Sequence, residues 1–138
     1  HLDMNYVANH YGKYSKSEID VAGALKDSAF KILRDTIDFK TGCSGAVGHE
    51  NDKVFLLGEE VINQSIPLIL CAEEDVEGAH GAAIGSLDEE MLFYLASRGI
   101  PKEEAEKLVI YANFNKLLRH IPDGDIKDKT EKLLPEVL

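Results

Sequence analysis

Alternating apolar and polar residues dominate the first half of the chain and predict β-structure. We expect residues 29–39 to form two short strands that bend near Arg34 and Asp35. Residues 40–53 contain three glycines and a polar run, and we expect a loop there. The predicted strands lie at residues 2–10, 18–25, 29–39, 54–57, 61–63 and 66–71.

In the second half, the apolar residues recur with the period of an amphipathic helix. Ser86 and Glu89 match a capping box, and Gly99 suits the left-handed residue that follows a helix. The predicted helices span 87–98, 101–119 and 125–134, and the first two should form a hairpin because so few residues join them. The buried face of the second helix should comprise Ala105, Leu108, Val109 and Ala112.

The strand pattern leaves the β-architecture open. Many short strands separated by small or polar turns are typical of a sandwich, a barrel or a β-solenoid. No strict hexapeptide or nonapeptide repeat is present, which weakens the solenoid interpretation without excluding it.

Composition narrows the class of protein. The 138 residues carry a formal net charge of −10, and their basic residues are scattered, which argues against nucleic acid or an anionic membrane as partner. The longest apolar run, 66–72, is far shorter than the roughly 20 residues of a membrane span. The chain starts without Met and at once alternates like a strand, so we expect an N-terminal part to be missing.

The two cysteines, Cys43 and Cys71, lie 28 residues apart and lack the spacing of a zinc ribbon or finger. We interpret both mainly as small buried hydrophobes. A disulfide would be unusual because the chain has the character of a cytoplasmic protein. A role in metal or sulfur chemistry is the remaining alternative.

Two stretches could carry chemistry. Acidic residues crowd positions 73–77, and His80 follows among small residues that leave its ring uncrowded; such a group could bind a metal or act in acid–base catalysis. The second stretch is His49–Asp52 (HEND), polar enough for a metal but also ordinary for a turn. Gly12–Lys13 does not fit the phosphate-loop pattern, and no G-x-S-x-G is present, so nucleotide binding and a serine nucleophile lack support.

Residues 75–100 (DVEGAHGAAIGSLDEEMLFYLASRGI) resemble the C-terminal signature of the SufB/SufD family of iron–sulfur cluster assembly scaffolds. The shared pattern is an acid-rich turn, then H-G-A, and then L-D-E-E-x-L-F-Y-L-x-S-R-G-I. The helix over 101–114 also resembles the closing helix of the family, and residues 1–72 resemble it more loosely.

The resemblance implies a mainly β protein with C-terminal α structure: the end of a right-handed parallel β-helix core over residues 1–80 and a helical domain over 81–138. It implies a scaffold rather than an enzyme, binding no nucleotide itself. A SufC-type ATPase would dock on the helices. A second SufB/SufD-type subunit would pair across the β-helix, as a heterodimer or homodimer, with a transient iron–sulfur cluster at or near the interface.

By the same resemblance, His80 matches a histidine of SufD-type subunits that is proposed to ligate the nascent cluster, and H-G-A favours the SufD-type branch. Two departures make a sulfur-accepting role doubtful. The cysteine of SufB-type members should fall near Asn51, where the chain has none. SufD-type members often carry a cysteine two residues before the histidine, where this chain has Gly78.

Two alternatives stay open at this point. The chain could be a solenoid interaction module that recruits the ATPase and binds no cluster. It could also be a β-helix hydrolase or lyase using the acids of 73–77 with His80, although such enzymes usually line their groove with basic and aromatic residues, and this chain has no Trp.

Overall fold

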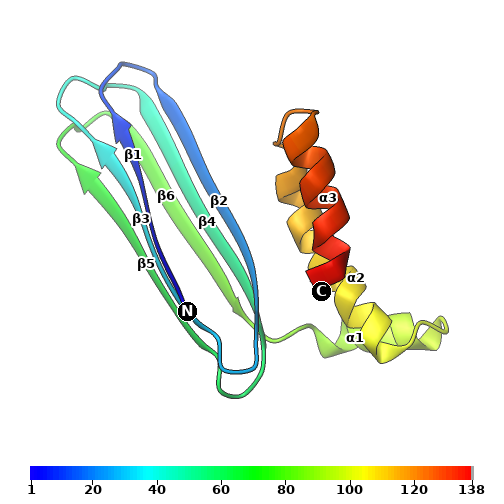
Figure 1. Cartoon of the computed structure of the whole chain (residues 1–138). Coiled ribbons are helices and arrows are strands. Elements are labelled where there is room, and N and C mark those ends of the chain that lie inside the picture. The colour runs from blue at the N-terminus through cyan, green and yellow to red at the C-terminus, as the bar shows by residue number, and fades with distance from the viewer. Residues whose placement is uncertain (138) are drawn as a thin grey trace.

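The computed structural model describes residues 1–137 and is mainly β, with three helices at the C-terminal end (Figure 1). The elements are β1 (Leu2–His10), β2 (Lys16–Lys26), β3 (Phe30–Phe39), β4 (Ala46–Leu57), β5 (Ile62–Cys71), β6 (Val76–Gly85), α1 (Glu89–Ser97), α2 (Lys102–Leu118) and α3 (Asp125–Val137).

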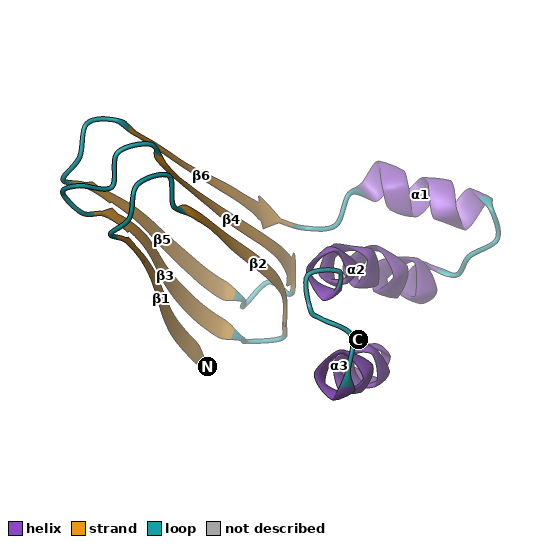
Figure 2. Cartoon of the chain, turned by 90° about the horizontal axis from the view of Figure 1, so that it is seen from above, coloured by secondary structure: helices purple, strands orange, loops and turns teal. Residues whose placement is uncertain are grey.

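The strands form two three-stranded sheets, β1-β3-β5 and β2-β4-β6, and every pairing in the described residues is parallel. Each strand pairs with the next but one, and successive strands alternate between the two layers seen in Figure 2. Leu2 pairs with Lys31 and Phe30 with Ile62, so the register advances by 29 and then 32 residues. This arrangement is consistent with a β-helix-like fold, and its long structural period explains why no short repeat is visible in the sequence.

Three strand predictions are wrong. The separate strands expected at 61–63 and 66–71 are one strand, β5. β3 is one continuous strand and does not bend near Asp35. β4 starts at Ala46, so most of the loop expected over 40–53 is a strand. The inward positions of β4 include Gly48, Glu50 and Asp52, and buried polar residues or glycine at those positions hide the apolar alternation that identifies a strand.

β6 extends the sheet through the glycine- and alanine-rich segment around His80 and ends at Gly85. The last strand therefore passes the expected domain boundary between residues 80 and 81. It is an edge strand, and nearly all of its residues are exposed.

One apolar core cluster lies between the sheets at the end where β3 leads into β4. Ile37, Phe39, Cys43 and Ala46 are fully buried there. Gly48 is required at this point because a Cβ atom would lie 2.7 Å from Ile37 Cγ2. Cys43 is thus a buried hydrophobe as expected, whereas Cys71 is exposed, and both cysteines are free.

The helices attach to the sheets through a second apolar cluster of Phe55, Leu87 and Ile110. Ser86 does not cap α1; instead, the Asp88 carboxylate accepts hydrogen bonds from the backbone N–H groups of residues 90 and 91, at 2.9 and 3.3 Å. Gly99 ends the helix with φ +86°, as predicted. No helix within residues 1–137 is both long and apolar enough to span a membrane.

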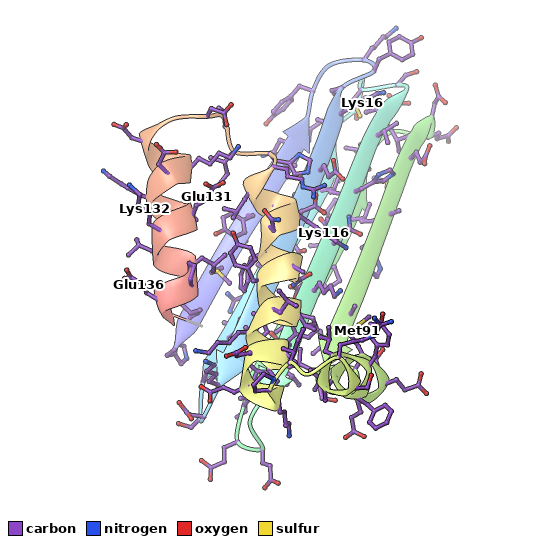
Figure 3. All side chains as sticks on the ribbon, turned by 90° about the vertical axis from the view of Figure 1, so that its right-hand side faces the viewer. Lys16, Met91, Lys116, Glu131, Lys132 and Glu136 are labelled. Atoms are coloured by element: carbon purple, nitrogen blue, oxygen red, sulfur yellow. The ribbon has the colours of Figure 1, made fainter. Side chains whose placement is uncertain are left out.

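α2 packs beside β2 and lies in front of the β2-β4-β6 sheet in Figure 3. Its buried face is shifted from the predicted one, because Ile110 and Asn113 are buried whereas Leu108 is 49% exposed. Lys116 lies at a groove of about 300 Å³ between α2 and the sheet. α3 contacts α2 and carries the charged side chains of Glu131, Lys132 and Glu136.

Candidate functional site

His80 lies in the middle of β6 with an exposed side chain. Its partner across the β4–β6 pairing is Glu50. Paired residues of neighbouring parallel strands point to the same face of the sheet, and the buried Glu50 shows that this face is the inner one. His80 therefore stands beside Glu50 at the open edge of the layer between the two sheets.

Four charged side chains are buried in this inner layer: Lys31, Asp35, Glu50 and Asp52. Lys31 and Asp52 form an ion pair, with Nζ 3.1 and 2.9 Å from the two carboxylate oxygens. Ser65 on β5 also donates a hydrogen bond to Asp52. The charges of Lys31 and Asp52 therefore satisfy each other. A buried ion pair needs such contacts because it has lost its hydration.

The other half is not satisfied. Both carboxylate oxygens of Glu50 and Oδ1 of Asp35 are buried without a hydrogen-bond partner among the described residues. Burial, reinforced by the nearby charge of Asp35, raises the pKa of Glu50 to about 7. Burial and the charge of Asp52 raise the pKa of Asp35, outweighing a backbone hydrogen bond and the charges of Lys31 and His80, which lower it. Two carboxyl groups in the core thus favour a proton or a cation.

The HEND stretch (49–52) is not a single polar cluster. Because it lies in β4, its side chains alternate between the two faces of the sheet. His49 faces outward, with Nε2 3.6 Å from Oε1 of Glu77. Asn51 also faces outward, donating from Nδ2 to Asp20 Oδ1 at 3.0 Å. The expectation of a loop that could gather these four groups around a metal is wrong.

The acids of 73–77 do not surround His80 either. Glu73 accepts a hydrogen bond from the backbone N–H of Gly42 at 2.8 Å, and Asp75 accepts one from Ser44 Oγ at 2.7 Å. These contacts join the β5–β6 turn to the β3–β4 turn. Glu73 and Asp75 therefore connect neighbouring turns, while Glu77 lies in β6 on the opposite face from His80, beside His49.

The family resemblance places cysteines near Asn51 and at Gly78. Neither position offers free space for a cysteine side chain beside His80. Asn51 points to the outer face, away from Glu50. At Gly78, a Cβ atom would lie 3.0 Å from Ile69 Cγ2 and 3.1 Å from Phe39 Cε2, so a larger side chain requires these neighbours to move. Within residues 1–137, no three His, Cys, Asp or Glu side chains gather in a group that could hold a metal ion.

The sequence pattern points to His80 and, within the HEND stretch, to Glu50 and Asp52, but it leaves out Lys31 and Asp35. A usable signal was present in 29–39, where Lys31 and Asp35 occupy the same alternating positions as Leu33 and Ile37. Charged residues on the apolar face of a strand are costly to bury, and they mark a polar network in the core.

Two parallel sheets whose strands alternate between layers, followed by a small helical unit, define a β-helix-like protein. Comparison with known sequences identifies the family. The family model described as "SUF system FeS cluster assembly, SufBD core domain" matches residues 1–113, and the chain belongs to the SufB/SufD family.

Individual relatives agree with this assignment. The chain is 38% identical over 118 residues to iron–sulfur cluster assembly protein SufD of Bacillus subtilis, covering 86% of this chain and 27% of the relative. It is 32% identical over 82 residues to SufD of Escherichia coli, covering 59% of this chain and 19% of that protein. A SufBD family protein of Pyrococcus horikoshii is 35% identical over 75 residues, which cover 54% of this chain and 17% of that protein. The chain therefore spans about a quarter or less of the length of these relatives.

Proposed function

We propose that the chain is part of a SufD-like scaffold subunit of a cytoplasmic Suf-type iron–sulfur cluster assembly complex. It acts as a right-handed parallel β-helix with a helical docking unit and is not itself an enzyme. The observation that carries the proposal is the position of His80, exposed in the middle of an edge strand of a SufB/SufD-family fold. Right-handedness is the general rule for parallel connections within a sheet and supports that part of the proposal.

Pairing with a second SufB/SufD-type subunit, identical or different, occurs at the end formed by β5 and β6. Both strands are sheet edges, and an edge offers unpaired backbone groups to another chain. The outer face of β5 adds a row of exposed apolar side chains, Ile66, Leu68 and Leu70. Such a row beside an edge is typical of an interaction surface.

A SufC-type ATPase docks on the helical unit. α1 has no buried residue and exposes Met91, Phe93 and Tyr94, which is expensive for a helix that has no partner. Replacing Phe93 with alanine should weaken capture of a purified SufC-type ATPase by this protein. Binding equal to that of the unchanged protein would refute the docking role of α1.

The cluster is the cargo of the complex, and His80 is its ligand from this subunit. Imidazole is a suitable ligand for iron. The test is complementation of a strain that lacks its own SufD-type subunit, using His80→Ala and, as control, His49→Ala, which alters a half-exposed histidine on the opposite face of the neighbouring strand. Only the first substitution should lower the cluster content of client proteins. Full activity of His80→Ala would remove the cluster-ligand role but not the scaffold role.

A second candidate function is an interaction module that recruits the ATPase and binds no cluster. The positions of the cysteines favour it: Cys71 ends β5 and Cys43 lies in the β3–β4 turn, whereas His80 is in the middle of β6. Anaerobic reconstitution with iron and sulfide, with and without the partner subunit, separates the two functions. A cluster that forms only when His80 is present supports the scaffold that binds cargo.

A further inference from the structure

We infer that Glu50 is a second iron-binding residue beside His80, so that the two side chains form half of a site for a ferrous ion, completed from outside this chain. The inference rests on the proposed function, because it assigns ferrous iron as the substrate handled at His80. It pairs His80 with Glu50, which the sequence pattern offered only as one of four residues in the HEND stretch.

The register of the sheet brings the two residues together. Glu50 and His80 are direct partners in the β4–β6 pairing, and neighbouring strands lie about 4.8 Å apart. Their side chains project to the same face, so a carboxylate oxygen and a ring nitrogen can approach one ion from adjacent strands. His80 is exposed at the open edge of the layer between the sheets, which gives an ion a route to the pair from outside.

Among the described residues, no cation and no side-chain donor is bonded to the carboxylate of Glu50. It is 1% exposed, and neither of its oxygens has a hydrogen-bond partner among the described residues. A buried carboxylate without partners is costly, and a bound cation removes that cost. Asp52, two residues further along the same face, is different. Its carboxylate already accepts hydrogen bonds from Lys31 and Ser65.

The donor set suits ferrous iron. Imidazole together with carboxylate is a frequent combination around non-haem Fe(II), and such sites keep open positions for other ligands. Residues 1–137 contain no ready group of three ligating side chains, so the pair leaves positions for sulfide and for groups of a second subunit. An incomplete site at an edge strand fits a carrier that must pass its cargo on.

Anaerobic titration of the full chain with Fe²⁺ by calorimetry tests the inference, and the visible absorption of Co²⁺ serves as a spectroscopic probe of the same ligands. The variants are Glu50→Gln, His80→Ala and the double substitution. Glu77→Gln is the matched control, because it removes an exposed carboxylate of β6 that faces His49. Glu50→Asp keeps a carboxylate and tests rescue. Circular dichroism confirms that each variant is folded.

The expected result is a loss of Fe²⁺ affinity of at least about tenfold in each single variant, partial recovery in Glu50→Asp and no change in Glu77→Gln. The double variant should lose less than the product of the single losses, since both side chains serve one ion. Loss of binding in His80→Ala but not in Glu50→Gln would overturn the role of Glu50 and leave the proposed function standing. Unchanged binding in both variants, or no binding by the unchanged chain, would overturn the inference, and the first of these results would also remove His80 as a ligand.

Discussion

Replacing Glu50 with glutamine should stabilise the protein at alkaline pH and not at acidic pH. Glutamine has nearly the shape of the protonated glutamic acid but never carries the charge. In the folded chain, burial and Asp35 raise the pKa of Glu50 from 4.5 to about 7. The folded state therefore binds the proton more tightly than the unfolded state, and its stability falls as the pH rises through this window.

The magnitude follows from the difference between the two pKa values. One pKa unit corresponds to about 1.4 kcal/mol, so the shift of Glu50 amounts to at most about 3.5 kcal/mol once the pH is well above 7. Below pH 4.5 the contribution is fully retained, because Glu50 is then protonated in both states. Asp35 acts in the same direction, since its pKa is also raised.

Urea denaturation followed by circular dichroism at pH 5 and pH 8 measures the effect. The unchanged chain should lose stability between these two values, whereas Glu50→Gln should lose much less and should be the more stable protein at pH 8. Glu60→Gln, at an exposed turn, is the control and should follow the unchanged chain. Parallel pH profiles for the unchanged chain and Glu50→Gln would refute the claim that Glu50 is a buried, unpartnered acid.

Three further predictions concern the fold that positions the site. Lys31→Met should destabilise the chain by about 3–5 kcal/mol in urea denaturation, because it leaves the buried Asp52 without its cation; a smaller loss than in an exposed lysine variant would contradict this. Gly48→Ala should cost about 1–3 kcal/mol, since its new methyl group overlaps a core isoleucine, whereas Gly85→Ala, with open space around it, should cost far less in the same assay. Asp88→Ala should weaken α1 by about 1 kcal/mol, because the helix loses its N-cap, and the effect is measured as faster amide exchange in that helix. Ser86→Ala is the control and should leave the exchange unchanged.

Much of the fold is encoded locally and could be predicted from the sequence. The alternation of 2–10 identified β1, and the helical period together with Gly99 identified α1 and α2. The motif around His80 was sufficient to indicate the family, which the comparisons confirm over residues 1–113. These features depend on residues near one another in the chain, where backbone geometry alone sets the pattern.

The site itself depended on strand pairing. Lys31 and Asp35 on β3 meet Glu50 and Asp52 on β4 because these strands lie in opposite sheets and face the same inner layer, and His80 joins them because β6 pairs with β4. A shift of one residue would turn Glu50 to solvent and bring Asn51 beside His80. The sequence by itself determined β1, β2, the helices and which histidine is unusual, but not the full extent of β4 or the existence of β6. Only the tertiary structure decided that His80 stands next to a buried acid without a partner, because that contact is made between strands and not along the chain.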